Sequence, residues 1–380
     1  MDSLNEAKQL ISQSQNICLI PFSSSQISQN ETWKDKNEPE SLTAALALFY
    51  TLKELNKNVN LIVDNFPEKL NFLVPSPDFI TSPKNFVISI PRDLADVSQI
   101  YYEKNEENLK IHLTVNKGNV KKEGISFYFS DAKPDLTITL GIKDLQGQLS
   151  DQLDFFDFLL DVPILNIDTL ATLSADGEEN KKFGKVNVIK EKSICEIVLE
   201  TIKSIDENLV NKDVANCLLT GLTIYYENFK KRNTSPEVLQ IVAELVKRGA
   251  LQYQIHDNLQ KMTKKEIDFF SNIFRNLKTI DNYEVSFAML NSNEFQSFGK
   301  NEADFTVEKI KTIGIQNDML VLWKGHSSDP TIKGFFYSRK PDLINRVSKS
   351  QRSFASQDWV FLSMPGTDIN SAKELIIKLL

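Results

Sequence analysis

The stretch PILNIDTLATL, residues 163–173, begins as an apolar run and then places one carboxylate, Asp168, where a buried strand would end. Three more stretches have the same character: NICLIPF (residues 16–22), NVNLIVD (58–64) and DLTITLGI (135–142). Short, nearly continuous runs of Val, Ile and Leu that alternate with helices are typical of parallel strands buried on both faces. The sequence therefore predicts an α/β fold in which a parallel sheet has helices on both of its faces.

The segments around these strands complete the pattern. LTAALALFYTLKELNK (residues 42–57) has apolar side chains at helical spacing, and Ser41 is a candidate N-cap for this helix. NFVISIP (residues 85–91) is predicted as a further buried strand. LKIHLTVNKGN (109–119) and GISFYFS (124–130) are predicted as the two strands of a hairpin with a Gly-Asn turn.

The domain organisation follows from length and from a change of pattern toward the C-terminus. A chain of 380 residues favours two domains. The first is predicted at residues 1–258, with a hairpin insertion at about 105–131. Residues 259–280 are assigned to a linker helix, and residues 281–380 to a smaller α+β domain that is rich in strands.

Composition limits the classes of function. The formal net charge of −7 repels nucleic acids, so we expect no extended nucleic-acid surface. The N-terminal MDSLNEAKQL lacks a basic segment followed by an apolar core, and no run of about 18 apolar residues occurs. We therefore expect a cytoplasmic protein that does not bind a membrane.

Searches for the common catalytic motifs fail. The sequence contains no G-x-x-x-x-G-K-[ST], G-x-G-x-x-G, H-E-x-x-H or G-x-S-x-G pattern. Cys18, Cys195 and Cys217 lie inside apolar stretches rather than in metal-binding pairs, so they are predicted to be buried side chains. The three histidines are scattered and are expected to be surface or packing residues.

Several blocks, in order, resemble one family. ESLTAALALFYTLKELNKNV resembles the helix after the family's first Asp-rich turn, and PILNID resembles the strand that carries its Asp-His-His. NKKFGKVNVI resembles an N-x-x-F-G-x-x-N segment, and YEVSFAML, DMLVLWKG and IKGFFYSRKPD resemble the associated C-terminal domain, which binds the substrate. The chain is thus similar to the DHH phosphoesterase superfamily, in its two-domain bacterial branch of oligoribonucleases and phosphoadenosine-phosphate phosphatases.

That resemblance implies a site for two divalent cations, usually Mn²⁺, which activate a water molecule and bind the phosphoryl group. Most of the ligand positions carry other residues in this chain. Glu38 and Glu40, in a predicted loop, replace the Asp-x-Asp pair, and Gly141 and Tyr225 replace two further aspartates. In Asp-His-His only Asp168 is retained, with Thr169 and Leu170 at the histidine positions.

The remaining acids have two interpretations each. Asp168 is expected to cap the following turn by accepting backbone N–H bonds, and the alternative is a retained metal ligand. Glu38 and Glu40 are expected in a solvated turn. Alternatively, both hold a single Mn²⁺ or Mg²⁺ ion together with Asp168. Tyr225 and Tyr226 are expected to fill the space of the missing cations.

Basic residues gather in the C-terminal tail, where the family binds phosphate. The resemblance makes Ser338, Arg339 and Lys340 candidate phosphate contacts. The alternative is an ordinary charged face of a strand and a helix. The wider group of cations is Lys333, Arg339, Lys340, Arg346, Lys349 and Arg352.

Three functions remain open. The first is a DHH-type protein with an eroded metal site, which binds a nucleotide, a short oligonucleotide or a protein partner between its domains without hydrolysis and needs no cofactor. The second is an active metal-dependent oligoribonuclease or nucleotide phosphatase with a rebuilt site around one Mn²⁺ or Mg²⁺ ion. The third is a protein-interaction scaffold whose contact surface is the polar loop 22–41 or the hairpin near 109–130.

Overall fold

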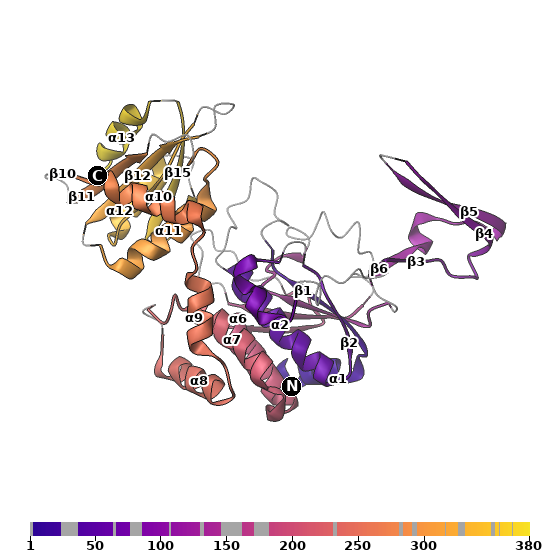
Figure 1. The fold of residues 1–380 in the computed structure, drawn as a ribbon. Coiled ribbons are helices and arrows are strands. Elements are labelled where there is room, and N and C mark those ends of the chain that lie inside the picture. The colour runs from indigo at the N-terminus through magenta and orange to yellow at the C-terminus, as the bar shows by residue number, and fades with distance from the viewer. Residues whose placement is uncertain are drawn as a thin grey trace. The chain divides into compact units, whose positions relative to one another are not determined.

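A computed structural model shows the fold of the chain (Figure 1). It describes residues 3–23, 37–63, 66–76, 86–105, 108–129, 133–145, 162–170, 182–230, 234–280, 284–290, 295–315, 317–325, 331–350, 354–356, 358–366 and 368–380. The chain divides into two compact units, Met1–Gln260 and Lys261–Leu380. No helix in the described residues is both long enough and apolar enough to cross a membrane.

A five-stranded parallel sheet forms the centre of the first unit, and the α/β prediction is confirmed. Its strands follow the order β2-β1-β7-β8-β9. Leu19 of β1 lies beside both Leu61 of β2 and Ile138 of β7, which fixes the register of these three neighbouring strands. The strand bounds are β1 Asn16–Pro21, β2 Asn58–Leu61, β7 Leu136–Leu140, β8 Ile164–Thr169 and β9 Val186–Lys190.

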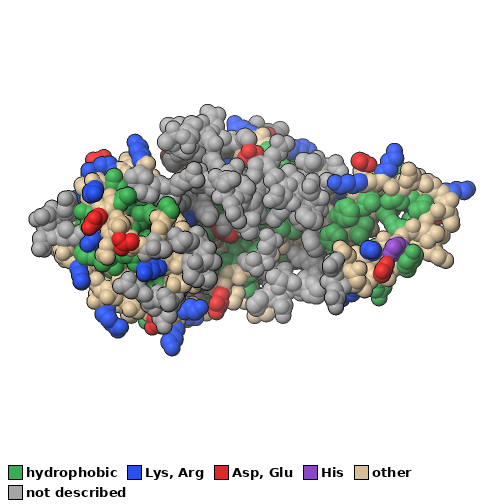
Figure 2. Space-filling model, turned by 90° about the horizontal axis from the view of Figure 1, so that it is seen from above, with side chains coloured by type: hydrophobic (Ala, Val, Ile, Leu, Met, Phe, Trp, Pro, Cys, Tyr) green, Lys and Arg blue, Asp and Glu red, His purple; other side chains and the backbone are tan. Residues whose placement is uncertain are grey.

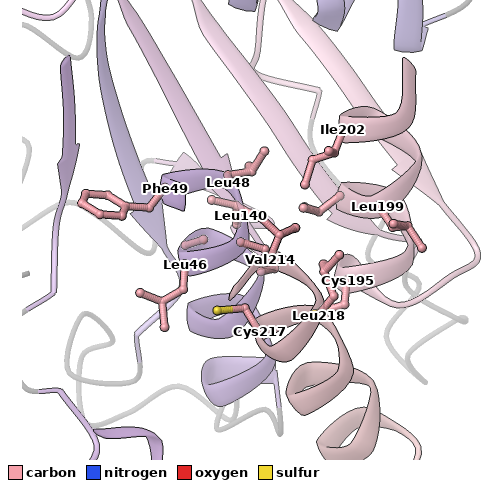
Figure 3. Close-up of a cluster of buried hydrophobic side chains, with 14 of the residues drawn as sticks. Leu46, Leu48, Phe49, Leu140, Cys195, Leu199, Ile202, Val214, Cys217 and Leu218 are labelled. Carbon is pink, nitrogen blue, oxygen red and sulfur yellow. The ribbon is translucent and has the colours of Figure 1, made fainter. Parts of the chain in front are cut away.

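The sheet is flanked by helices whose apolar faces form the main core with its alternate strand residues. The principal helices are α1 (Ser3–Gln13), α2 (Asn37–Glu54), α6 (Ile194–Ile205) and α7 (Lys212–Tyr225). Figure 3 shows Leu46 of α2, Leu199 of α6 and Leu218 of α7 gathered in this core. Cys18 and Ile20, on the other side of β1, belong to a smaller cluster on the opposite face of the sheet.

Helix α2 begins earlier than the sequence predicts. The prediction starts the helix at Leu42 with Ser41 as its cap, but α2 starts at Asn37 and includes Glu38 and Glu40 in its first turn. The loop expected around the two glutamates is therefore wrong. The helix can begin there because Pro39 fits the first turn, where a missing backbone N–H has no helical partner to lose.

Among its described residues, the first unit also contains helices α8 and α9 and the 3-10 segments η2, η3 and η4. Helix α8 begins with Ser235 as N-cap, whose hydroxyl accepts a hydrogen bond from Val238 N, and Pro236 occupies the first turn. The bounds are α8 Pro236–Lys247, α9 Gln252–Gln260, η2 Glu68–Leu73, η3 Lys122–Gly124 and η4 Glu207–Leu209.

The predicted hairpin is wrong in its strand pairing. The strand expected at residues 109–119 pairs with β4 (Ala95–Lys104) as β5 (Leu109–Gly118), and not with the following strand. That following strand, β6 (Ser126–Phe129), pairs with β3 (Phe86–Ser89). Gly118 has a φ of +90°, and its position against Leu94 O leaves no room for a Cβ atom, so the glycine serves a close strand approach and not a hairpin turn.

Strand β3 also differs from its prediction as a buried strand of the main sheet. It lies in a two-stranded antiparallel ladder, with Phe86 and Ile88 exposed. The β4–β5 ribbon, called the arm below, extends from this ladder (Figure 1). A run of β-branched and aromatic residues fits an exposed ribbon as well as a buried strand, because its local pattern specifies only the extended conformation.

The second unit contains a six-stranded sheet, as the predicted smaller α+β domain requires. The order is β10-β11-β12-β13-β15-β14, and the β11–β12 pair is parallel while the others are antiparallel. The strands are β10 Lys278–Ile280, β11 Val285–Leu290, β12 Asp318–Lys324, β13 Thr331–Tyr337, β14 Phe354–Ala355 and β15 Trp359–Pro365. The helices are α10 Lys264–Arg275, α11 Lys300–Ile313, α12 Pro341–Ser350 and α13 Ile369–Ile377.

The boundary between the two units falls after Gln260, within residues 259–280, the range assigned to a linker helix. In the structure α9 belongs to the first unit, and α10 begins the second. Phe269 and Ile273 of α10 are fully buried in a core that also contains Trp323 and Phe335. Helix α10 is therefore part of the core of the second unit and does not stand free as a linker.

Candidate functional site

The carboxyl ends of β1, β7 and β8 lie together at one edge of the parallel sheet. Phe22 N donates to Leu140 O at 2.9 Å, and Gly141 N donates to Ile167 O at 3.0 Å, so the residues leaving the three strands stay in register. Open α/β sheets bind their ligands at this edge. Gly141 and Asp168, two positions that the family pattern assigns to metal ligands, are therefore neighbours here.

Gly141 lies where the pattern expects a carboxylate, and the space around it is closed. Its φ is +73°, and a Cβ atom would lie 2.9 Å from Ile194 Cδ1 and 3.2 Å from Ser41 Oγ. The Ser41 hydroxyl is held in place, because it donates to Leu140 O at 2.5 Å and accepts from Phe22 N at 2.9 Å. Ser41 thus ties α2 to the sheet edge, and an aspartate at position 141 would collide with this arrangement.

Glu40 is completely buried and caps the start of a second helix. Its Oε1 accepts a hydrogen bond from Cys195 N at 3.2 Å, in the first turn of α6. The positive end of a helix macrodipole favours a carboxylate at this position. The prediction of a solvated turn is wrong for Glu40, because the extension of α2 to Asn37 brings this residue against α6.

Glu38 takes a different direction. Its Oε1 accepts a hydrogen bond from Ser23 Oγ at 3.0 Å, and its side chain is half-buried. Residues two apart on a helix point about 200° apart, because each residue turns the helix by about 100°. The structure therefore does not bring Glu38 and Glu40 together as a chelating pair.

A second carboxylate, that of Glu196, takes part in capping the N-terminus of the same helix, α6. Glu196 and Ser193 form a capping box, with Ser193 N donating to Glu196 Oε2 and Glu196 N donating to Ser193 Oγ, each at 3.1 Å. The buried Tyr226 hydroxyl donates to the same Oε2 at 2.7 Å. Burial raises the pKa of Tyr226 well above its usual value, and the bond to Glu196 raises it further. The first turn of α6 is thus satisfied by groups of the protein itself.

Sequence reasoning missed Glu196 as a member of this edge, although a signal was available. The S-x-x-E pattern at Ser193 is a capping-box sequence and predicts the helix start. Nothing local to Tyr226 predicts that its hydroxyl donates to Glu196, because Glu196 lies in α6 and Tyr226 follows the end of α7.

Tyr225 occupies the position of the last expected metal aspartate. It is the final residue of α7, and its ring lies edge-on to Tyr226 with a centroid distance of 4.9 Å. The next three residues have left-handed backbone conformations, with φ of 50° for Glu227, 57° for Asn228 and 62° for Phe229. Each such non-glycine residue is disfavoured by about 1–2 kcal/mol. Helix α7 therefore ends in an aromatic pair and a strained turn.

Asp168 is fully buried at the end of β8, and its Oδ1 accepts a hydrogen bond from Thr169 N at 2.8 Å. An N-cap accepts from the residue two or three positions on, so this bond to the adjacent residue does not establish the predicted cap. Leu170 is about half exposed, and its N–H donates to Lys190 O at 2.8 Å, which continues the pairing with β9. The two histidine positions of the family pattern therefore supply one hydroxyl and one apolar side chain.

A row of polar side chains crosses three strands beside Asp168. Thr139 Oγ1 donates to Asn166 Oδ1 at 3.0 Å, and Asn166 Nδ2 lies 3.5 Å from Asn187 Oδ1. Asn187 also accepts from Gly184 N at 3.1 Å and donates to Gly184 O at 2.7 Å. The last asparagine of the N-x-x-F-G-x-x-N block thus holds the turn at Gly184, and the block has a structural explanation.

The two cysteines near this edge are not reactive groups. Cys195 is fully buried, and its pKa is raised well above the usual value by burial and by the neighbouring Glu40 carboxylate. Burial likewise raises the pKa of Cys217. A reactive cysteine requires a lowered pKa and access to solvent. All three cysteines are free and buried, as the sequence predicts.

The predicted phosphate contacts of the second unit lie between β13 and α12. Ser338 is buried, and its Oγ accepts from Lys340 N at 3.0 Å. Arg339 is exposed, and its Nε donates to Tyr337 Oη at 3.4 Å, which raises its pKa. Lys340 Nζ lies 3.5 Å from an oxygen of Glu284. Within the part of the chain that the structure describes, the exposed Arg339 guanidinium forms no ion pair, although the Asp318 charge contributes to raising its pKa.

The wider group of basic residues does not share one location in the described part of the chain. Lys333 Nζ donates to the backbone oxygen of Phe298 at 3.1 Å, and Arg346 Nη1 donates to that of Leu380 at 3.3 Å. Arg352 lies outside the described residues, as does most of the polar loop 22–41. The structure therefore places Lys333 and Arg346 against different backbone segments.

No group of three or more His, Cys, Asp or Glu side chains that could hold a metal ion occurs among the described residues. Glu38, Glu40 and Asp168 are thus not brought together as one ligand set. The buried carboxylates at this edge instead bond to backbone N–H groups of Cys195 and Thr169.

Comparisons with known proteins extend this description. No family model matches the sequence, and neither does any curated protein. An exopolyphosphatase-related protein from Bacteroides fragilis matches in structure with a TM-score of 0.66 and 14% identity, over 99% of this chain and 95% of that one. A Methanococcus jannaschii protein assigned as a family II inorganic pyrophosphatase aligns over 64% of this chain and 78% of that one, with 15% identity and a TM-score of only 0.30, which is too low to support an argument. The chain therefore shares the fold of an exopolyphosphatase-related protein.

Proposed function

We propose that this protein is a DHH-type phosphoesterase fold that has lost two-metal hydrolysis and binds the phosphate groups of a nucleotide or a short oligonucleotide without cleaving them. The observation that carries the proposal is the hydrogen bond from Cys195 N to the Glu40 carboxylate. One oxygen of this buried carboxylate is therefore engaged by the first turn of a helix.

Two-metal catalysis needs many oxygen and nitrogen donors around two ions a few ångströms apart. At this edge the candidate donors are few. Gly141 supplies no side chain and Leu170 an apolar one, while Glu38 and Glu40 point in different directions. Each missing ligand lowers metal affinity, and together they leave too few donors for a pair of ions.

Arg339 is the group that we propose for phosphate binding. A guanidinium matches phosphate oxygens with two parallel hydrogen bonds and remains charged at all physiological pH values. Lys340 is a weaker candidate, because Glu284 and Asp318 lie 3.5 and 3.8 Å from its Nζ. Its charge is partly neutralised before any ligand arrives.

The proposal is tested by two measurements on the pure protein. In the first, short oligonucleotides, 3′,5′-bisphosphonucleotides and pyrophosphate are incubated with Mn²⁺, and we expect no turnover. In the second, fluorescence anisotropy follows binding of a labelled trinucleotide. Arg339→Ala should weaken binding about tenfold. Arg346→Ala, a matched loss of an exposed arginine in the same unit, should leave binding unchanged.

A second candidate, an active phosphoesterase with a rebuilt site, rests on Asp168. This carboxylate is fully buried at the carboxyl edge of the sheet, where the family binds metal. Robust Mn²⁺-dependent turnover that disappears in Asp168→Asn would establish this candidate and reject the first. Calorimetric titration with Mn²⁺ or Mg²⁺ provides a second criterion, because the rebuilt site requires saturable binding of at least one ion.

A further inference from the structure

The arm has two chemically different faces. Directly opposite residues of an antiparallel pair share a face, and so do alternate residues along each strand. The pairs Ile100 with Leu113 and Tyr102 with Ile111 therefore place four apolar side chains on one face. The paired residues of this apolar face are Val97, Ile100, Tyr102, Lys104, Leu109, Ile111, Leu113 and Val115. Val97 pairs with Val115 on this face because the register shifts between Val97 and Gln99.

The other face is polar. Its directly opposed pairs are Gln99 with Thr114, Tyr101 with His112 and Glu103 with Lys110. The His112 ring stacks on Tyr101 at a centroid distance of 4.5 Å, and its Nε2 lies 3.6 Å from Glu103 Oε2. This face therefore carries the polar and charged side chains that are usual on a solvent-exposed surface.

The apolar face is open to solvent. Tyr102 is 75% exposed, Ile100 70%, Leu109 61% and Ile111 47%. In Figure 2, hydrophobic side chains are visible along the arm, with lysine and arginine side chains at its edges. Because a two-stranded ribbon alone is marginally stable in water, an exposed apolar face of this length indicates that something covers it.

We propose that a second copy of this chain covers this face, and that two arms pack face to face about a two-fold axis. The apolar face carries one charge, Lys104, at the tip of the ribbon. In an antiparallel stack each Lys104 lies beyond the apolar centre of the other arm, so no charge is buried and no like charges are opposed. The same patch thus serves on both copies, as a two-fold interface requires.

The exposed area of the apolar face can be compared with the area that a specific dimer interface buries. The four exposed side chains present about 500 Å² per copy, taking about 200 Å² for a large side chain in an extended chain. Two copies then bury about 1,000 Å², which is the lower limit for a specific interface. The partly exposed Val97, Leu113 and Val115 add to it. The two ribbons together form a two-layer sandwich with the usual sheet spacing of about 10 Å.

The test compares two tyrosines that are adjacent in sequence and lie on opposite faces. Sedimentation velocity over a concentration series from micromolar upward should show a dimer for the unaltered protein. A central interface side chain contributes at least tenfold to affinity, and a two-fold interface contains each substitution twice. Tyr102→Glu should therefore weaken the dimer about 100-fold or more, whereas Tyr101→Glu, on the polar face, should leave it intact.

A cross-linking measurement keeps the proposal testable if Tyr102→Glu disturbs the arm. The native cysteines are all buried, so a cysteine introduced on the surface is the reactive one. A short bismaleimide cross-linker, which spans the gap between two packed sheets, should join two copies of Ile111→Cys and should not join Thr114→Cys, which lies on the polar face.

A monomer at every concentration, or equal cross-linking of both cysteine variants, would overturn the proposal. A monomer would instead assign the apolar face to a different partner. Neither result bears on hydrolysis or nucleotide binding, so the proposal stands apart from the proposed function.

Discussion

Two substitutions of Glu40 distinguish a helix-capping role of its carboxylate from a metal-binding role. Glu40→Gln keeps an oxygen that can accept the hydrogen bond from Cys195 N, whereas Glu40→Ala removes the acceptor. A capping role tolerates the first change and not the second. A metal-binding role tolerates neither, because an uncharged amide binds Mn²⁺ poorly compared with a carboxylate.

The expected magnitudes follow from the local geometry. Both residues are fully buried, so Glu40→Ala leaves Cys195 N without an acceptor and away from water. Loss of a capping acceptor destabilises by about 0.5–2 kcal/mol, and an unsatisfied buried N–H by about 1–3 kcal/mol. Because both values describe the loss of the same hydrogen bond, we expect Glu40→Ala to lower the free energy of unfolding by about 1–3 kcal/mol. Glu40→Gln loses only the interaction of the charge with the helix end, about 0.3–1 kcal/mol.

The assay is urea unfolding of both variants and of the unaltered protein, each with and without Mn²⁺. Glu38→Ala is the matched control, since it removes a neighbouring acid that bonds to a serine hydroxyl, and we expect a loss of about 0.5–1.5 kcal/mol or less. Equal losses for Gln and Ala at position 40 would refute the capping argument. So would an Mn²⁺-dependent gain of about 2.7 kcal/mol, the value at a hundredfold excess over Kd, that Glu40→Gln abolishes.

Three further predictions concern the same core. Tyr226→Phe removes the hydrogen bond to the buried Glu196 carboxylate and should lower the free energy of unfolding by about 1.5–3 kcal/mol in urea melts; an unchanged midpoint would contradict this role. Gly221→Ala would place a Cβ atom 2.2 Å from Cys195 Sγ and 2.4 Å from Thr43 Oγ1, so we expect it to lower the free energy of unfolding by about 1–3 kcal/mol. The double variant, in which Thr43→Ala is added, should recover part of this loss. Burial raises the pKa values of Tyr226 and Cys195 above their ordinary 10.0 and 9.0, so the unfolded chain ionises first as the pH rises. The stability that these groups contribute should be complete below about pH 9 and decline at higher pH, and urea midpoints that rise through the alkaline range would disprove this.

Local patterns were sufficient for the fold class and for most elements of the parallel sheet. The apolar runs at residues 16–22, 58–64, 135–142 and 163–173 contain β1, β2, β7 and β8. Their character is local, because a strand that is buried on both faces must be apolar along its whole length. The same argument failed at residues 85–91, where an apolar run forms half of an exposed two-stranded ladder. Whether this run is buried depends on which other segment of the chain packs against it, and the sequence of the run itself does not specify that segment.

The sequence predicts a location for the candidate site, and the structure shows which residues meet there. The strand that ends at Asp168 indicated one edge of the sheet, since parallel strands end on one side. The state of each residue there was decided by distant partners. Glu40 and Cys195 are separated by 155 positions in the chain, and their hydrogen bond exists because α2 and α6 pack on the same face of the sheet.

By itself the sequence determined that a parallel sheet would form and where most of its strands would run. Only the tertiary structure decided that Gly141 has no space for a side chain, that Glu40 caps α6, and that the arm leaves one apolar face in solvent. The physical reason is that hydrophobic periodicity is a property of neighbouring residues, whereas room, burial and hydrogen-bond partners are properties of segments that meet only after folding.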